Sequence, residues 1–227
     1  MKYRYEATSI EGFIQQLAVS YVAHGYWFYV AGFVPKGKDP AAVDEKLITK
    51  YGVNLSKFQR ARRKAAGLAN VQYLRCGRFF VLLATHGIHS FFAEEEASIK
   101  DMRETPIKFG SYSVSFRSGH PHVRIDRDTY RDFKHYFLDL AIRRSSAELE
   151  NALGRLPFEP WAPVRRQMLA IVRGINRRRK TAQLKPISTS CLRLRRRVVR
   201  PFERPTNFAF EEVVSSSAQF ATIRQPS

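Results

Sequence analysis

Two glycine-centred breaks between β-rich segments constrain the fold of this chain more than any other feature. Residues 71–84 (VQYLRCGRFFVLLA) break at Cys76-Gly77, where glycine allows the positive φ of a tight hairpin turn. Residues 108–117 and 122–125 are likewise separated by Ser118-Gly119. In residues 108–117, polar and apolar side chains alternate as they do in a half-buried strand, and the inward residues are Tyr112, Val114 and Phe116. The middle of the chain is therefore predicted to be antiparallel sheet.

Helical periodicity surrounds the predicted hairpins. Apolar residues recur at three- and four-residue spacing, and capping residues stand at the starts, as Thr8 and Glu11 do in a predicted capping box. The segments with this pattern are residues 8–22, 39–51, 54–68, 126–144 and 160–180. Residues 26–34 are instead aromatic and β-branched, and we expect a central strand that is covered on both faces.

The order of these elements predicts an α+β fold, with a mainly antiparallel sheet flanked by helices and a basic helical C-terminal extension. We expect an α+β core domain over residues 1–156, an arginine-rich helical extension over residues 157–205 and a disordered tail over residues 206–227. Hydrophobic residues make up 44% of the chain, which is enough to bury a core that offsets the entropy of ordering.

Simple counts disfavour several classes of protein. The two cysteines, Cys76 and Cys191, have no nearby cysteine or histidine pair, which argues against a disulfide framework or a zinc finger. No apolar run approaches the roughly 20 residues of a membrane-spanning helix, so no membrane partner is expected. The first residues lack the apolar region of a secretory signal. We therefore expect a cytoplasmic or nucleoid-associated protein, or a nuclear one in a eukaryotic host.

The net charge of +19 is concentrated in the C-terminal third. Residues 155–204 hold 15 lysines and arginines against Glu159 and Glu203, and 13 of these cations are arginines. A guanidinium binds phosphate through two parallel hydrogen bonds and stacks on bases. This composition predicts RNA or DNA as the partner, with structured RNA slightly favoured because arginine-rich segments often fold against it.

The densest basic run is CLRLRRRVVR, residues 191–200, whose arginines would share a face in either a helix or a strand. An ordinary solvated surface and a nuclear-localisation peptide are the alternative interpretations. We expect part of residues 183–205 to become ordered only on binding. The predicted nucleic-acid contacts are Arg60, Arg63, Lys64, Arg166, Arg173, Arg177, Arg178, Arg179, Lys180, Arg193, Arg195, Arg196, Arg197 and Arg200. Tyr73 and Tyr112 are candidates either for stacking on bases or for core packing.

His120 and His122 stand two residues apart, so a strand would direct both imidazoles to one face, where they can share a divalent metal. The pattern resembles the His-hydrophobic-His element of the HUH nucleases of rolling-circle replication and transposition, with Pro121 in the middle position. This resemblance implies a metal-dependent single-strand nuclease or transposase in which a tyrosine attacks the DNA phosphodiester. Tyr130 is the candidate nucleophile, and Tyr136 follows it, both closer to the histidines than in that family.

A second histidine cluster, His86 and His89, precedes three consecutive glutamates at residues 94–96. It is either a metal site or a turn followed by a solvated run, and the glycine between the histidines favours the turn. The chain has no phosphate-cradling glycine loop, nucleophile elbow or zinc-protease motif. We expect no cofactor, apart from a divalent metal if the protein is a nuclease.

Three functions stay open from the sequence. The first is a non-catalytic nucleic-acid-binding protein, within a ribonucleoprotein or mobile-element system, that grips phosphates with its arginine-rich region. The second is the HUH-type nuclease or transposase, and the third is an adaptor that docks on an acidic protein. The sequence names no protein partner.

Overall fold

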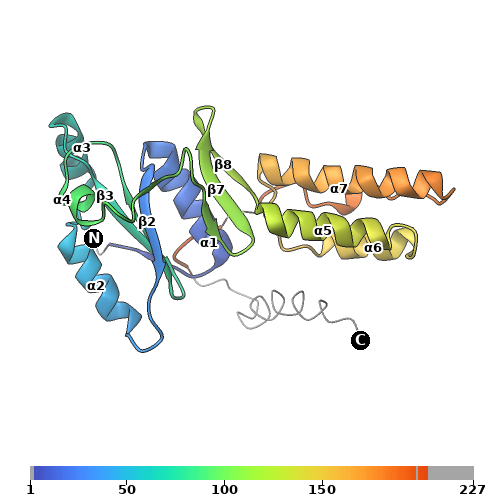
Figure 1. Cartoon of the computed structure of the whole chain (residues 1–227), viewed down its shortest axis with the longest axis horizontal. Helices are drawn as coiled ribbons and strands as arrows, with labels where there is room; N and C mark the ends of the chain where they lie inside the picture. The colour runs from blue at the N-terminus through green and yellow to red at the C-terminus, as the bar shows by residue number, and fades with distance from the viewer. Residues whose placement is uncertain (1–2, 198, 204–227) are drawn as a thin grey trace.

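The computed structural model describes residues 3–197 and 199–203 (Figure 1). Its two sheets are mainly antiparallel, with strand orders β1-β3-β4-β2-β5 and β6-β7-β8. The strands are β1 (Glu6–Ala7), β2 (Phe28–Phe33), β3 (Val71–Cys76), β4 (Phe79–Ala84), β5 (Lys100–Asp101), β6 (Ile107–Phe109), β7 (Tyr112–Arg117) and β8 (His120–Ile125). Among these strands, only β1 and β3 pair in parallel, and Leu68 and Ile88 form a further isolated parallel bridge. The predicted α+β class is confirmed.

The helices in the described residues are α1 (Ile10–Gln15), α2 (Pro40–Lys50), α3 (Lys57–Ala65), α4 (Ser90–Glu94), α5 (Arg127–Leu140), α6 (Ser146–Gly154) and α7 (Ala162–Thr181). A π-helical turn and a short 3-10 turn extend α1, and Gly25 ends it in the left-handed region with φ +92°. The predicted cap of α1 is wrong by one residue, because Ser9 and not Thr8 accepts the Gly12 N–H. Helix α6 was not predicted, although Ser145 and Glu148 form a capping box at its start.

Both predicted hairpins are confirmed. β3 and β4 pair antiparallel across Gly77, which has φ +58°, and β7 and β8 pair across Ser118 and Gly119. The prediction for β2 is wrong in one respect, because its outer half is exposed and Phe33 retains 70% of its accessible surface. β5 pairs with β2 only at Phe28 and Tyr29, so the outer half of β2 is also the edge of the sheet.

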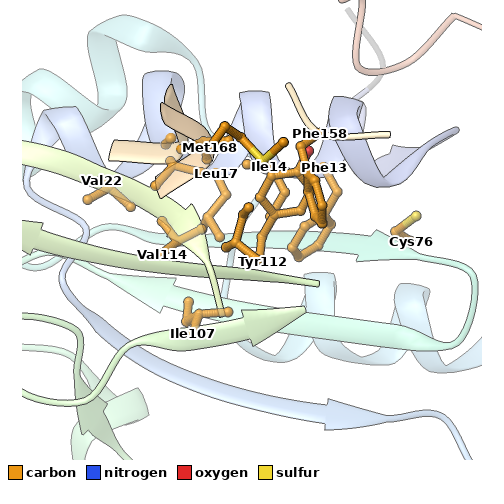
Figure 2. Packing of buried hydrophobic residues seen from close by; sticks show 14 of the residues in the cluster. Phe13, Ile14, Leu17, Val22, Cys76, Ile107, Tyr112, Val114, Phe158 and Met168 are labelled. Atoms are coloured by element: carbon orange, nitrogen blue, oxygen red, sulfur yellow. The ribbon is translucent and has the colours of Figure 1, made fainter. Parts of the chain in front are cut away.

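Apolar side chains are buried on both faces of the first sheet. On one face, Phe13, Ile14 and Leu17 pack among residues of both sheets and of the helices that follow them (Figure 2). On the other face, the buried cluster comprises Tyr51, Val53, Val71, Tyr73, Leu82, Ala84 and Phe91. This arrangement explains why every residue of β3 is buried.

The larger cluster extends across position 156, where the sequence suggested a boundary. Phe158, Val164 and Met168 pack in the same cluster as Tyr112, so the helical region shares its core with the sheets. Helices α5, α6 and α7 lie together and extend away from the sheets (Figure 1). The tail predicted to be disordered, residues 206–227, lies outside the described residues. Within the described parts of the chain, no helix is long and apolar enough to cross a membrane.

The described part of the basic C-terminal segment packs against the rest of the protein, and the expectation that part of residues 183–205 becomes ordered only on binding stays a prediction. Ile187 and Leu192 are buried. The Thr8 N–H donates to the carbonyl oxygen of Pro201 at 3.0 Å, so the segment returns to the start of the chain. Leu192 is buried in the core, and Cys191 and Phe202 pack against it, so apolar side chains at the two ends of the basic run anchor the segment.

Candidate nucleic-acid interface

Helix α7 carries seven basic residues and no acidic residue. Its predicted apolar stripe is confirmed, because Val164, Met168, Ile171, Val172 and Ile175 are all buried. On the outer side, exposed cations follow at spacings of seven, four and three residues, which keeps them within an arc of about 60° and a length of roughly 21 Å. These residues, called the α7 stripe below, are Arg166, Arg173, Arg177 and Lys180.

The α7 stripe has no acidic partner among the residues that the structure describes. Arg173 donates only to the carbonyl of Leu169, in its own helix, at 3.3 Å. By contrast, Arg178 donates to the Leu138 carbonyl at 2.9 Å and lies 3.6 Å from Asp139. The four stripe cations therefore present their charge to solvent, whereas Arg178 is held against α5.

The prediction that Arg179 contacts nucleic acid is wrong. Its guanidinium is buried and donates to the carbonyl oxygens of Lys185, Ala141 and Arg144 at 2.6, 2.7 and 2.8 Å. A buried cation needs such partners to offset its lost hydration. Arg179 thus holds three backbone segments together and is not available to a nucleic acid.

The β7–β8 hairpin has a polar face that carries further cations. The register places Arg124 opposite Ser113, His122 opposite Ser115 and His120 opposite Arg117, so these side chains lie on one face of the sheet. The opposite face is apolar, with Val123 and Ile125 buried in the core. The strand alternation therefore separates a core face from a cationic face.

Gln167 attaches the start of α7 to this hairpin. Its side-chain amide accepts from the Ile125 N–H at 2.8 Å and donates to the Ile125 carbonyl at 3.0 Å, as a neighbouring strand would. Arg166, the residue before Gln167, lies close enough to the polar face for its charge to act on His122. The hairpin cations and the α7 stripe consequently meet at Arg166.

The pKa of His122 depends on the positive charges at this junction. Partial burial lowers the pKa of the imidazole, and the positive charges of Arg124, Arg117 and Arg166 lower it further. We call Arg117, His122, Arg124 and Arg166 the cationic cluster. Several positive charges with no opposing carboxylate in the described structure form a site suited to an anion such as phosphate.

The residues of the nuclease interpretation are arranged less favourably for a metal. His120 and His122 share a face, as predicted, but arginines surround His122 and would repel a divalent cation. No group of three or more His, Cys, Asp or Glu side chains that could hold a metal occurs in the described part of the chain. Burial raises the pKa of Tyr130, which lies on α5 near Arg173, and a raised pKa disfavours a tyrosinate nucleophile.

The second predicted histidine cluster has a structural explanation. His89 is the N-cap of α4, and its Nδ1 accepts from the Phe91 N–H at 3.0 Å. Glu94 pairs with Lys50 at 2.6 Å, and Glu95 accepts a hydrogen bond from Tyr51. The carboxylates are therefore engaged with neighbouring side chains rather than directed at a shared ion.

In the densest basic run, the described residues 192–197, 199 and 200 form neither a regular helix nor a strand. Arg193 pairs with Glu159 at 2.7 Å, and Arg196 lies over the Trp161 ring with its guanidinium carbon 3.5 Å from the centroid. The expectation that its arginines share one face is wrong, because these two are directed at the protein. Arg200 pairs with Glu203 at 2.9 Å. Arg195 and Arg197 are exposed, and their predicted phosphate contacts stay predictions.

The basic helix α3 also uses some of its arginines internally. Arg60 donates to the carbonyl of Leu55, and Arg63 donates to that of Ala69 at 2.9 Å, whereas Lys64 is exposed. Tyr73 and Tyr112 are buried, so their core interpretation is confirmed and their proposed stacking on bases is excluded.

Sequence reasoning missed Arg117 and Arg124 as members of the site. The alternation of β8 already put Arg124 on the same side as His122, and this signal was present in the sequence. The approach of Arg166, more than forty positions later, depends on the Gln167 contact and has no local signal. No family model, no curated protein and no solved structure matches the chain.

Proposed function

We propose that this protein binds nucleic acid by its phosphate backbone, through the α7 stripe and the cationic cluster. The observation that carries the proposal is the row of exposed cations along one side of α7, which no described acid pairs. Lysines and arginines that neutralise phosphates release condensed counterions, and this release drives association. The net charge of +19 adds long-range attraction to the same partner.

The proposal covers RNA and DNA alike. The slight preference for RNA rests on a basic segment expected to fold on binding, and the described part of that segment also contacts the protein itself. The proposed partner implies a cytoplasmic or nucleoid location, or a nuclear one in a eukaryotic cell. A ribonucleoprotein or a mobile-element system is a compatible setting.

The test removes the α7 stripe without changing the fold. A variant with Arg166, Arg173, Arg177 and Lys180 all replaced by glutamine should bind a duplex oligonucleotide far more weakly, because it loses four exposed charges. If all four contact phosphates, the slope of log Kd against log salt concentration should fall by about three to four. The measurement is a fluorescence-anisotropy titration at several salt concentrations.

A matched control variant removes the same number of positive charges from another part of the surface. Lys36, Lys38, Lys46 and Lys100 are exposed and lie away from α7, and their replacement by glutamine should have a much smaller effect. Equal losses of affinity in the two variants would show that binding depends only on the total positive charge, and this result would overturn the proposal. Absence of nucleic-acid binding by the wild-type chain would favour the acidic-protein adaptor. Single-strand cleavage lost with His120, His122 or Tyr130 would favour the nuclease.

A further inference from the structure

Helix α3 is fixed so that one side faces the protein and the other faces solvent. Ser56 and Gln59 form a capping box at its start. The inner side is anchored by backbone contacts of Arg60 and Arg63, and the Asn70 amide donates to the Arg60 carbonyl at 3.0 Å. These contacts leave the opposite side of the helix outward.

The outward side presents an aromatic ring among cations. Phe58 retains 78% of its accessible surface. Ala61, Arg62 and Ala65 follow on the same face at helical spacing, and the two alanine side chains are too small to cover the ring. Lys57, Arg62 and Lys64 are exposed around it, and α3 contains no acidic residue.

This combination matches the two chemical parts of a single-stranded nucleic acid. An unpaired base has a flat π-face that stacks on an exposed aromatic side chain, and the phosphates on either side of the base are attracted to nearby cations. An acidic protein would satisfy the cations but would leave the ring without a specific partner.

We propose that the outer face of α3 is a second nucleic-acid site, at which Phe58 stacks on an unpaired base while Lys57, Arg62 and Lys64 contact the flanking phosphates. This inference rests on the proposed function, since it takes the same class of ligand. Figure 1 shows α3 at one end of the molecule, whereas α7 extends toward the other end. The second site is thus spatially separate from the α7 stripe.

The experiment compares a single-stranded oligothymidylate with a duplex of equal length. Phe58→Ala should weaken binding of the single strand about tenfold and leave duplex binding unchanged, because duplex bases are already stacked. Phe33→Ala is the matched control, since Phe33 is also an exposed phenylalanine but lies on β2. Phe58→Trp should keep the single-strand affinity, and its fluorescence, measured against the wild type, should be quenched by the bound base.

The outcomes separate this site from the proposed function. Equal single-strand affinities of Phe58→Ala and the wild type, with no quenching in Phe58→Trp, would overturn the stacking site while duplex binding still supported the α7 interface. Equal losses in Phe58→Ala and Phe33→Ala would also overturn it. If neither oligonucleotide bound the wild-type chain, both proposals would fail.

Discussion

The environment of each arginine decides its role in this protein. Arg75 is buried and pairs with the buried carboxylate of Asp44 at 2.8 Å, which also accepts from the Tyr73 hydroxyl at 2.6 Å. Arg179 is buried against carbonyl oxygens, and Arg177, two positions earlier, is exposed. Neighbouring arginines in one helix therefore serve stability and binding separately, because successive side chains point about 100° apart.

Replacement of Arg179 tests the structural role. Arg179→Met should lower the free energy of unfolding by about 2–4 kcal/mol, because three carbonyl oxygens lose a charged donor in a buried place. Arg177→Gln should change it by less than about 0.5 kcal/mol. Urea unfolding followed by circular dichroism measures both. A change in Arg179→Met no larger than that in Arg177→Gln would contradict the assignment.

The titration of His122 tests the cationic cluster. Burial and the three neighbouring arginines lower its pKa, so the imidazole should titrate below its ordinary value of about 6.5. A phosphate bound beside it would raise that pKa, and binding would therefore take up a proton. Affinity should accordingly increase as the pH falls from 7.5 toward 6. NMR of the imidazole protons measures the pKa, and His122→Gln should abolish this part of the pH dependence.

At the scale of elements, the interface depends on how α7 meets β8. β8 is an edge strand, and the Gln167 amide occupies its open edge at Ile125. The helix is thereby fixed relative to the hairpin at the end where Arg166 lies. This contact, together with the packing of α7 and β8 in the same core, sets the distance between the α7 stripe and the hairpin cations.

Gln167→Met should separate packing from hydrogen bonding at this junction. The thioether has a similar length but cannot satisfy the Ile125 N–H and carbonyl, so the free energy of unfolding should fall by about 1–3 kcal/mol. Gln167→Glu retains an acceptor for the N–H but places a carboxylate oxygen against the Ile125 carbonyl oxygen, so it should be destabilised as well. Thermal unfolding of the three proteins decides between them, and an unchanged Tm in Gln167→Met would show that the contact contributes little.

At the scale of the whole molecule, the basic C-terminal segment connects distant parts of the chain. Arg193 meets Glu159 before α7, Arg196 covers Trp161, and the carbonyl oxygens of Pro201 and Glu203 accept from Thr8 near the start of the chain. The segment thus contributes to stability through partners far from it in sequence.

Two double variants distinguish stability from binding within this segment. Arg193→Gln with Arg196→Gln should lower the free energy of unfolding by about 1–2 kcal/mol, because Glu159 loses its cation and Trp161 loses its cover. Arg195→Gln with Arg197→Gln removes the same charge from exposed positions and should leave stability nearly unchanged. Denaturant unfolding gives both values. Equal stabilities of the two variants would mean that the segment is only a solvated charge run.

The sequence by itself determined the elements that local chemistry specifies. Glycine turns set both hairpins, Asp39 and Pro40 set the start of α2, and apolar spacing set the buried stripe of α7. Turn residues, caps and apolar spacing each involve residues only a few positions apart, so they can be recognised in a single sequence. The capping box of α6, formed by Ser145 and Glu148, is a local signal of the same kind.

Only the tertiary structure decided which cations are free to bind. Arg179 and Arg193 are engaged by carbonyl and carboxylate oxygens from other segments, whereas Arg166 joins Arg124 through packing of α7 on β8. The exposed setting of Phe58 likewise follows from the anchoring of α3 by distant backbone groups. A charge pattern states where cations occur along the chain, but their availability depends on partners brought close by folding, and those partners have no fixed spacing in the sequence.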